Sequence, residues 1–204
     1  MWKNRDAVNI PEIRLIAGFL ISVMFISACS GLNRSDKPAL TTWWLEPYKS
    51  NATVPSTEPP VSVSVSVTVI PGLDTQQILT LSENAEMNKF AAARWADSLP
   101  ELTASLVARS LESSGRFEVL SGSGNTNACD LELEVREFYA RLDSSGQTRG
   151  VRVAIHGRYL CTGSEPVMIH LNALTPVHDD RMTVIVAAFQ QAVDDVMKNL
   201  LKTI

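Results

Sequence analysis

The side chains with the most versatile chemistry in this 204-residue sequence are three cysteines and three histidines. Cys29 ends an apolar segment, whereas Cys129 and Cys161 lie in the second half of the chain. A cysteine thiolate can act as a nucleophile or a metal ligand, and two thiols can form a disulfide. Which of these reactions each residue can undergo depends on the elements that position it.

Signatures of catalysis are scarce. The sequence contains no G-x-S-x-G nucleophile motif, no Walker A motif and no H-E-x-x-H zinc motif. Gly122-Ser123-Gly124 is interpreted only as part of a flexible loop, Ser121–Asn127. The formal net charge is −4 and no basic footprint is present, which argues against nucleic-acid binding. We therefore expect no enzymatic activity, no cofactor and no nucleic-acid partner.

The apolar segment from Leu15 to Ala28 is too short to span a membrane. As a helix it would reach about 21 Å at about 1.5 Å per residue, whereas the hydrocarbon core of a bilayer is about 30 Å thick. Basic residues precede it, namely Lys3, Arg5 and Arg14. A short apolar region after basic residues is typical of a secretory signal peptide.

Ile26-Ser27-Ala28-Cys29 resembles the lipobox of bacterial lipoproteins, in which an aliphatic residue and two small residues precede an invariant cysteine. The resemblance implies that Cys29 receives a diacylglyceryl group, that residues 1–28 are removed as a signal peptide, and that the new amino group is acylated. Three acyl chains, at about 0.8 kcal/mol per buried CH₂, would anchor the protein stably. A plain signal peptide or an uncleaved anchor is the alternative.

The mature chain has a simple organisation. Residues 29–41 are polar and are expected to form a tether, and residues 42–204 are expected to form one globular domain. Removal of three basic and two acidic residues with the signal peptide leaves a net charge of −5. Many Gram-negative lipoproteins that stay at the inner membrane carry aspartate after the cysteine. Ser30 therefore favours the inner leaflet of the outer membrane, facing the periplasm.

Alternation of apolar and polar residues predicts several strands. The clearest is Val61–Ile70, where valines occupy odd positions and serines or threonine even ones. Its small polar face is interpreted as solvated, with contact to another subunit as the alternative. The other strands are expected at Thr42–Pro47, Gln77–Ser82, Lys89–Trp95, Phe117–Leu120, Val167–Leu174 and a long pair in between.

Two long amphipathic helices are also expected. Ser98-Leu99-Pro100-Glu101 is a capping box with proline in the first turn, and Gly115 is placed to end that helix. Asp179 or Asp180 is expected to cap the final helix. The apolar stripe of the final helix is Met182, Ile185, Val186, Phe189, Val193, Val196 and Leu200. The sequence thus predicts an α+β two-layer sandwich with a mostly antiparallel sheet.

The long strand pair has a predictable register. We expect the hairpin to fold about Ser145, with a bulge near Arg136-Glu137 where the alternation breaks. The facing pairs are then Val135 with Ile155, Leu131 with Tyr159, Glu132 with Arg158, Glu134 with His156, and Cys129 with Cys161. This register brings Cys129 and Cys161 within reach of a disulfide, which suits an exported domain. Two reduced, buried cysteines are the alternative.

One constellation suggests a metal site. If the turn at residues 162–164 has the simplest register, His170 lies opposite His156. Glu134, His156 and His170 then form a row across three strands, and these residue types can bind zinc. An exposed polar face without metal is the preferred interpretation.

Several motifs together resemble a known family. They are the lipobox, Trp44-Leu45, Ile70-Pro71-Gly72-Leu73-Asp74, the stretch from Arg94 to Pro100, and the stretch from Leu111 to Phe117. Their order is similar to that of the ABC-type transport auxiliary lipoproteins, the PqiC-like family, over roughly Thr41 to the C-terminus. In this chain tryptophan stands where family members often have tyrosine at the start of the first strand.

The resemblance implies a docking role rather than an activity. Such lipoproteins work beside an MCE-domain periplasmic protein and its ABC transporter, which move lipids or other apolar molecules. Self-association is conceivable for a protein that meets a symmetric MCE ring. The alternatives are an assembly factor of another envelope machine, of the secretion or Tol type, and a zinc-binding periplasmic protein. Within the motif, Trp95 is expected to pack beneath the helix that begins at Ser98.

Overall fold

The computed structural model describes residues 39–50, 59–120 and 129–204. Predictions for the signal peptide, Cys29, Ser30, most of the tether and the loop Ser121–Asn127 lie outside the described residues. The described elements are β1 (Thr41–Trp43), β2 (Val61–Val69), η2 (Pro71–Leu73), β3 (Gln77–Leu81), β4 (Met87–Trp95), α2 (Leu99–Ser113), β5 (Phe117–Leu120), β6 (Cys129–Leu142), β7 (Thr148–Leu160), β8 (Val167–Pro176) and α3 (Met182–Thr203).

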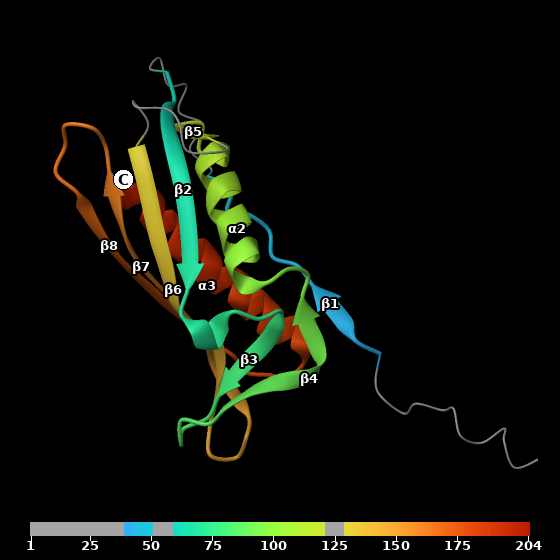
Figure 1. Cartoon of the computed structure of the whole chain (residues 1–204). Coiled ribbons are helices and arrows are strands. Elements are labelled where there is room, and N and C mark those ends of the chain that lie inside the picture. The colour runs from blue at the N-terminus through green and yellow to red at the C-terminus, as the bar shows by residue number, and fades with distance from the viewer. Residues whose placement is uncertain (1–38, 51–58, 121–128) are drawn as a thin grey trace, which may run out of the picture. The chain divides into compact units, whose positions relative to one another are not determined.

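The eight strands form one mixed sheet organised around β6. One side of β6 pairs antiparallel with β7, which pairs antiparallel with β8. The other side pairs with two strands in succession, first β2 and then β3, both parallel to β6. β5 extends the sheet beyond β2, and β4 and β1 extend it beyond β3 (Figure 1).

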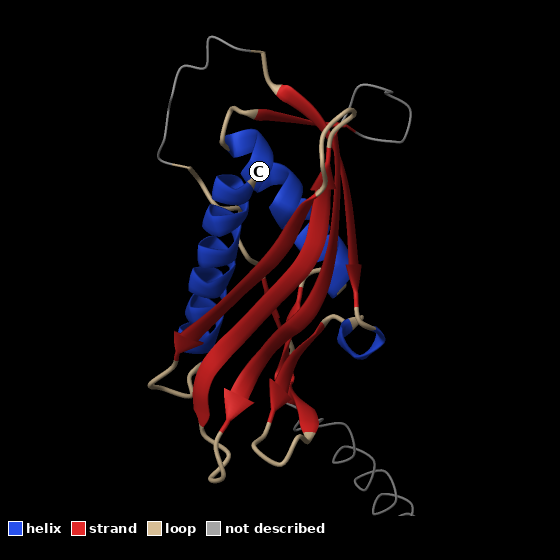
Figure 2. Ribbon diagram, turned by 90° about the vertical axis from the view of Figure 1, so that its left-hand side faces the viewer, coloured by secondary structure: helices blue, strands red, loops and turns tan. Residues whose placement is uncertain are grey.

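Both helices pack on the same face of this sheet, as Figure 2 shows. α2 packs against β2 and β5, and α3 packs against β7 and β8. The α+β two-layer sandwich expected from the sequence is therefore confirmed, and antiparallel ladders hold most of the paired residues. None of the helices among the described residues is long and apolar enough to cross a bilayer.

The β6/β7 ladder has the predicted register. Val135 lies opposite Ile155, Leu131 opposite Tyr159 and Glu132 opposite Arg158, and the register shifts at Arg136 as a bulge. Odd-numbered apolar residues before the bulge are buried on the helix side, because a period of two places alternate side chains on opposite faces.

The core between sheet and helices contains an aromatic cluster. Trp95 lies 5.8 Å from Phe138 of β6 and 5.1 Å from Phe189 of α3, measured between ring centroids and in edge-on geometry. Phe138 and Phe189 stack 5.1 Å apart. Trp95 is thus buried, as expected, but its aromatic partner among the helices is α3 rather than α2. It joins β4, β6 and α3 into one core.

The first strand is shorter than predicted. β1 ends at Trp43, and the chain then leaves the sheet to reach α3. The amide of Glu46 donates to Gln190 Oε1 at 2.8 Å, and Gln190 Nε2 donates to the Glu46 carbonyl at 2.9 Å. A glutamine side chain of the helix therefore satisfies the backbone groups that a neighbouring strand would have paired.

The helix starts differ from the predictions in detail. Ser98 is the N-cap of α2, but its hydroxyl lies 2.7 Å from Glu101 Oε2 instead of capping a backbone amide. Arg181, rather than either aspartate, is the N-cap of α3. Asp180 Oδ1 accepts a 2.7 Å hydrogen bond from the Thr148 amide, which diverts it to the start of β7. Gly115 adopts φ +69° after α2, as expected for a helix end.

Candidate functional site

The face of the sheet that carries no helix is the candidate functional site, and we call it the open face. It comprises the outward side chains of four neighbouring strands, β2, β6, β7 and β8. Its members are Ser62, Ser64, Ser66, Thr68, Glu132, Glu134, His156, Arg158, Met168, His170, Asn172 and Leu174. The alternation that buries the valines and leucines of these strands places these residues outward.

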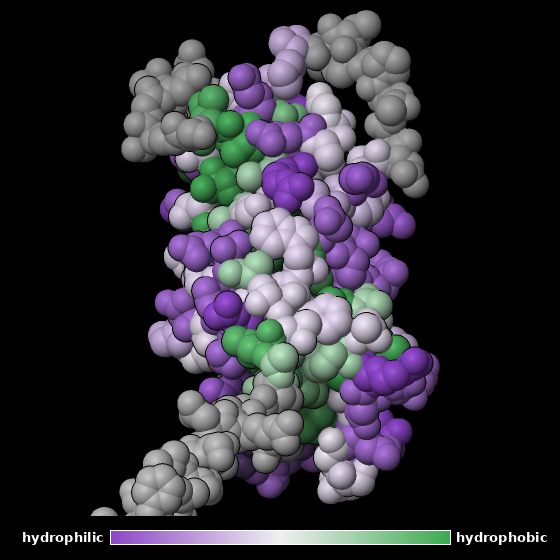
Figure 3. Space-filling model, turned by 90° about the vertical axis from the view of Figure 1, so that its right-hand side faces the viewer, coloured by the Kyte–Doolittle hydropathy of each residue, from purple (hydrophilic) through white to green (hydrophobic). Residues whose placement is uncertain are grey.

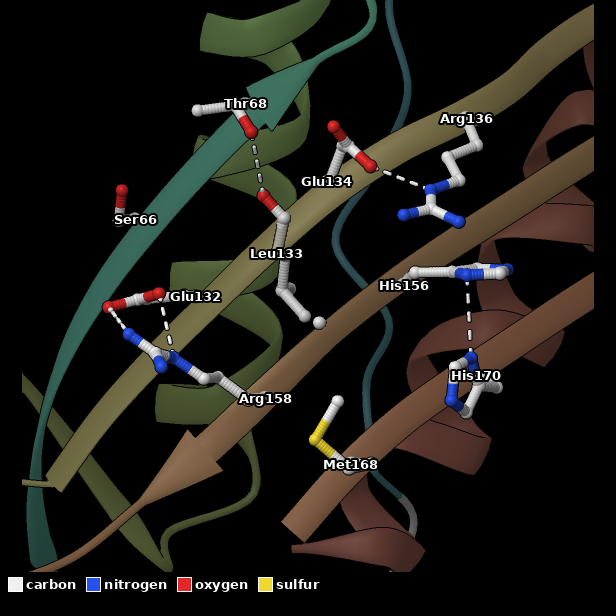
Figure 4. Close-up of a pocket in the computed structure, with 11 residues that line it drawn as sticks. Ser66, Thr68, Glu132, Leu133, Glu134, Arg136, His156, Arg158, Met168 and His170 are labelled. Carbon is white, nitrogen blue, oxygen red and sulfur yellow. Dashed lines mark hydrogen bonds and ion pairs between the residues drawn. The ribbon is translucent and has the colours of Figure 1, made fainter. Parts of the chain in front are cut away.

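A shallow hollow of about 390 Å³ lies on the open face. It extends from Thr68 of β2 to Met168 and His170 of β8, as Figure 4 shows. The Thr68 hydroxyl donates to the Leu133 carbonyl at 3.3 Å, which ties β2 to β6 at the rim of the hollow. The hollow is lined by both charged and uncharged polar side chains.

Ion pairs run across the hollow. Arg158 donates to both carboxylate oxygens of Glu132, at 2.9 and 3.0 Å, and this hydrogen bonding lowers the pKa of Glu132. Arg136, the residue at the bulge, donates to Glu134 Oε2 at 2.6 Å. About half of each side chain in both pairs is exposed to solvent, so the pairs contribute little to stability. Their planar guanidinium and carboxylate groups can instead form ion pairs with charged groups of a partner.

A second charged group follows the bulge. Arg152 forms an ion pair with Glu137, and the Tyr139 hydroxyl donates to Glu137 at 2.9 Å. Burial and the hydrogen bond to Glu137 raise the pKa of Tyr139. The bulge shifts the outward direction on β6 from even-numbered to odd-numbered residues, so Glu137 and Tyr139 continue the same face beyond the hollow, although Tyr139 itself is buried.

The structure brings His156 and His170 together, as the predicted register required. Their Nδ1 atoms lie 3.3 Å apart and their rings meet edge to face. Partial burial, followed by the positive charges of Arg136 and His170, lowers the pKa of His156. The neutral form, which is the form that binds metal, is thereby favoured.

The metal site itself is incomplete. Two nitrogens bound to one tetrahedral Zn²⁺ at about 2.0–2.1 Å would lie about 3.3–3.4 Å apart. The Nδ1–Nδ1 distance of 3.3 Å matches this separation, but a hydrogen bond between the two rings accounts for it equally well. Glu134, the third candidate, is held by Arg136. Within residues 39–50, 59–120 and 129–204, no group of three or more histidine, cysteine, aspartate or glutamate side chains is placed to hold a metal ion.

Cys129 and Cys161 lie at the end of the β6/β7 ladder, where the register places them opposite each other. The structure joins them in a disulfide with Cα atoms 4.1 Å apart, closing a sequence separation of 32 residues. The bond lies beside Leu131 at the edge of the core, so it holds the two strands together rather than serving the hollow.

The side of the molecule that carries α2 and β1 has a mixed surface. Polar and apolar side chains are interspersed there, as Figure 3 shows. Leu40 and Trp44 are about half exposed near β1. Sequence reasoning missed three features of the open face: the Glu134–Arg136 pair, the Glu137–Arg152 pair and the exposed Met168 and Leu174. The Glu134–Arg136 pair could have been predicted, because its opposite charges lie two residues apart at the predicted bulge.

Comparison with known proteins decides the family. The family model described as ABC-type transport auxiliary lipoprotein component matches residues 44–200. The chain belongs to this family. The match covers β2 to β8 and nearly all of α3, and it confirms the resemblance found in the sequence. The protein is therefore an auxiliary lipoprotein component of ABC-type transport, associated with a transport system and with the cell envelope.

Solved structures with the same fold support this assignment at the level of architecture. One is a crystal structure of an uncharacterized protein, with a TM-score of 0.66, 13% identity and coverage of 81% of this chain and 98% of that chain. Another is protein XCC0632 from Xanthomonas campestris, with a TM-score of 0.62, 18% identity and coverage of 80% and 92%. No curated protein matches this chain significantly.

Proposed function

We propose that this protein is a non-catalytic docking subunit of an MCE-type ABC transport system that moves lipids or other apolar molecules. Acyl chains on Cys29 would anchor it to a membrane, with the domain facing the periplasm. The observation that carries this proposal is the family match over residues 44–200. The sequence Ile26-Ser27-Ala28-Cys29, which resembles a lipobox, precedes the matched region.

The open face is the surface we assign to the partner. It is broad because four strands contribute to it. It is expected to be rigid because β6 and β7, which form its centre, are joined by a long antiparallel ladder. Glu132, Arg158, Glu134 and Arg136 offer both signs of charge on one surface. Complementary charges of that kind steer association and fix orientation more than they add affinity.

The polar side chains of the hollow are engaged with one another, which favours recognition over catalysis. The carboxylates of Glu132 and Glu134 bind arginines, and the two histidines of the hollow contact each other. Groups held in this way are suited to recognition. A general base would instead need a free path to a substrate proton.

The anchor would determine where docking occurs. We infer cleavage before Cys29, triacylation, and export to the inner leaflet of the outer membrane because Ser30 follows the cysteine. Mass spectrometry of the protein from native envelopes tests the first two steps. An acylated N-terminal Cys29 is expected, and an unmodified N-terminus would contradict the anchor. A Ser30→Asp variant should shift to the inner-membrane fraction.

The partner is tested by capture from native cells. Full-length tagged protein, solubilised from envelopes in mild detergent, should recover an MCE-domain protein and its permease. A variant with Glu132→Arg and Arg158→Glu keeps the ion pair but reverses its polarity, so reduced capture by this variant would indicate a contact through the open face. Recovery of only secretin or Tol components would overturn the proposal in favour of another envelope machine.

A further inference from the structure

We propose that the hollow on the open face binds a soft monovalent metal ion, Cu(I), through His156, His170 and Met168. All three side chains line the hollow. Two come from β8 and one from β7, so the ion would join neighbouring strands of the sheet. The proposal does not depend on the identity of the transport partner.

The register of β7 and β8 brings the three side chains to one place. His156 lies opposite His170, and Met168 lies opposite Arg158, two residues further along the same face. Met168 is therefore the neighbour of His170 along β8 and the diagonal neighbour of His156 across the ladder. Diagonal neighbours in an antiparallel pair lie about 7–8 Å apart, within reach of long side chains. Figure 4 shows all three residues on the same surface of the two strands.

The two imidazoles are already close enough to share one ion. Nδ1 of His156 lies 3.3 Å from Nδ1 of His170. Two nitrogens bound to one metal at about 2.0–2.1 Å can have this separation. An ion can therefore replace the hydrogen bond between the rings with little movement of either strand. One ring would move its proton from Nδ1 to Nε2, because a neutral imidazole binds metal through its unprotonated nitrogen.

The thioether of Met168 determines which metal suits the site. Methionine sulfur is a soft ligand that selects Cu(I), whereas zinc is bound by nitrogen, oxygen or thiolate ligands. The described residues supply no third ligand of the zinc type beside the two histidines. Met168 is 61% exposed, and its unbranched side chain can turn its sulfur toward the imidazoles without disturbing the core. A ligand set that is incomplete for zinc is thus complete for Cu(I).

The charges around the hollow favour a monovalent ion over a divalent one. Arg158 is paired with Glu132, and Arg136 is paired with Glu134, so two carboxylates balance the two guanidinium groups. The two imidazoles and the thioether are themselves neutral ligands. Because the cost of moving an ion out of water increases steeply with its charge, neutral ligands in a balanced surrounding accept one positive charge more readily than two.

A competition titration tests the site. Full-length protein, purified in detergent and kept anaerobic with ascorbate, is titrated with Cu(I) in the presence of bicinchoninate, a chelator that is coloured when it binds Cu(I). The protein should withdraw one Cu(I) per chain from the chelator. Met168→Leu removes the sulfur but keeps a side chain of similar size, so the dissociation constant for Cu(I) should rise at least tenfold. Equal constants for the two proteins, or no withdrawal by the parent protein, would overturn the proposal.

Two controls separate loss of the thioether from other effects. Met87→Leu changes a methionine of β4 that is 43% exposed and lies outside the hollow, and it should leave Cu(I) binding unchanged. The weak binding of Zn²⁺ by the two imidazoles should be the same in Met168→Leu as in the parent protein, because a thioether is not a zinc ligand. Equal losses of Zn²⁺ and Cu(I) binding in Met168→Leu would contradict the assignment of Met168 as a ligand.

X-ray absorption at the copper edge identifies the ligands directly. Full-length protein loaded with one equivalent of Cu(I) should show scattering from one sulfur and two nitrogens around each copper. The sulfur contribution should be absent from Met168→Leu, and His170→Ala should lose one nitrogen. Sulfur scattering that persists in Met168→Leu would place the copper at a cysteine or another methionine, and it would overturn the proposal.

Discussion

The two faces of the β6/β7 ladder have the same backbone but opposite uses. On the helix side, Leu131 and Val135 are fully buried, and Ile155 is nearly so. On the open side, Glu132 and Arg158 form an ion pair that is about half exposed. Residues one position apart in sequence thus have different roles. The buried face determines the fold, and the open face is available for recognition. Substitutions on the two faces should accordingly affect different measurements.

The largest effect is expected at Gly157 of β7, where a side-chain atom has no space against β6. A Cβ atom at Gly157 would lie 2.1 Å from the backbone carbonyl oxygen of Glu132. Gly157→Ala must therefore push β6 and β7 apart, and we expect a loss of about 4 kcal/mol or more in unfolding free energy. Denaturant unfolding measures it. Gly72→Ala, where a Cβ meets nothing within 4 Å, is the control, and equal stability of both variants would contradict the prediction.

The disulfide tests how far covalent closure supports this ladder. Replacing both Cys129 and Cys161 with alanine should lower the unfolding free energy by about 3–4 kcal/mol, from the entropy of the closed loop in the unfolded chain. Reduction of the parent protein should give a similar loss. An unchanged denaturation midpoint in both experiments would indicate that the thiols are reduced in the native protein.

Neighbouring residues on β6 sharpen the comparison of the faces. Leu131→Ala removes a fully buried side chain and should cost about 3 kcal/mol of stability. Glu132→Ala removes a solvent-exposed ion pair and should leave the unfolding free energy almost unchanged, while weakening capture of the partner. If Glu132→Ala instead proved the more destabilising, the division between a folding face and a recognition face would be wrong.

The smallest effect expected is a pH dependence from the open face. The pKa of His156 is lowered in the folded protein, so the unfolded chain binds a proton more readily. Above pH 6.5, the ordinary histidine value, His156 is neutral in both states and does not lower the unfolding free energy. As the pH falls below 6.5 the unfolded chain takes up the proton first, so the unfolding free energy declines. Thermal unfolding between pH 5 and 7 should show a shallower decline for His156→Asn. A steeper decline in the variant would contradict the sign.

The incomplete metal site gives a further distinction. Because only two imidazoles come together, full-length protein should bind Zn²⁺ weakly in a calorimetric titration. His170→Ala removes one of the two ligands and should abolish this binding. Stoichiometric zinc that survives dialysis would restore the metal hypothesis.

Local patterns determined how much of this structure could be predicted. The β6/β7 register followed from alternation and charge pairing, and it brought His156 to His170 and Cys129 to Cys161. Contacts between distant segments were missed, because Gln190 binding to Glu46 and Asp180 binding to Thr148 leave no local signal. For the same reason the sequence did not predict that β2 and β3 each pair parallel with β6, one after the other along the same side.

The most direct test of the central claim is site-specific photo-crosslinking in intact cells. A photoreactive residue at Ser66, Glu134 or Asn172 reports on the open face, whereas the same residue at Arg109 or Gln191 reports on exposed positions of α2 and α3. We predict crosslinks to an MCE-domain protein from the open-face positions and none from the helix positions. Crosslinks from the helices alone would show that docking uses the other side of the molecule.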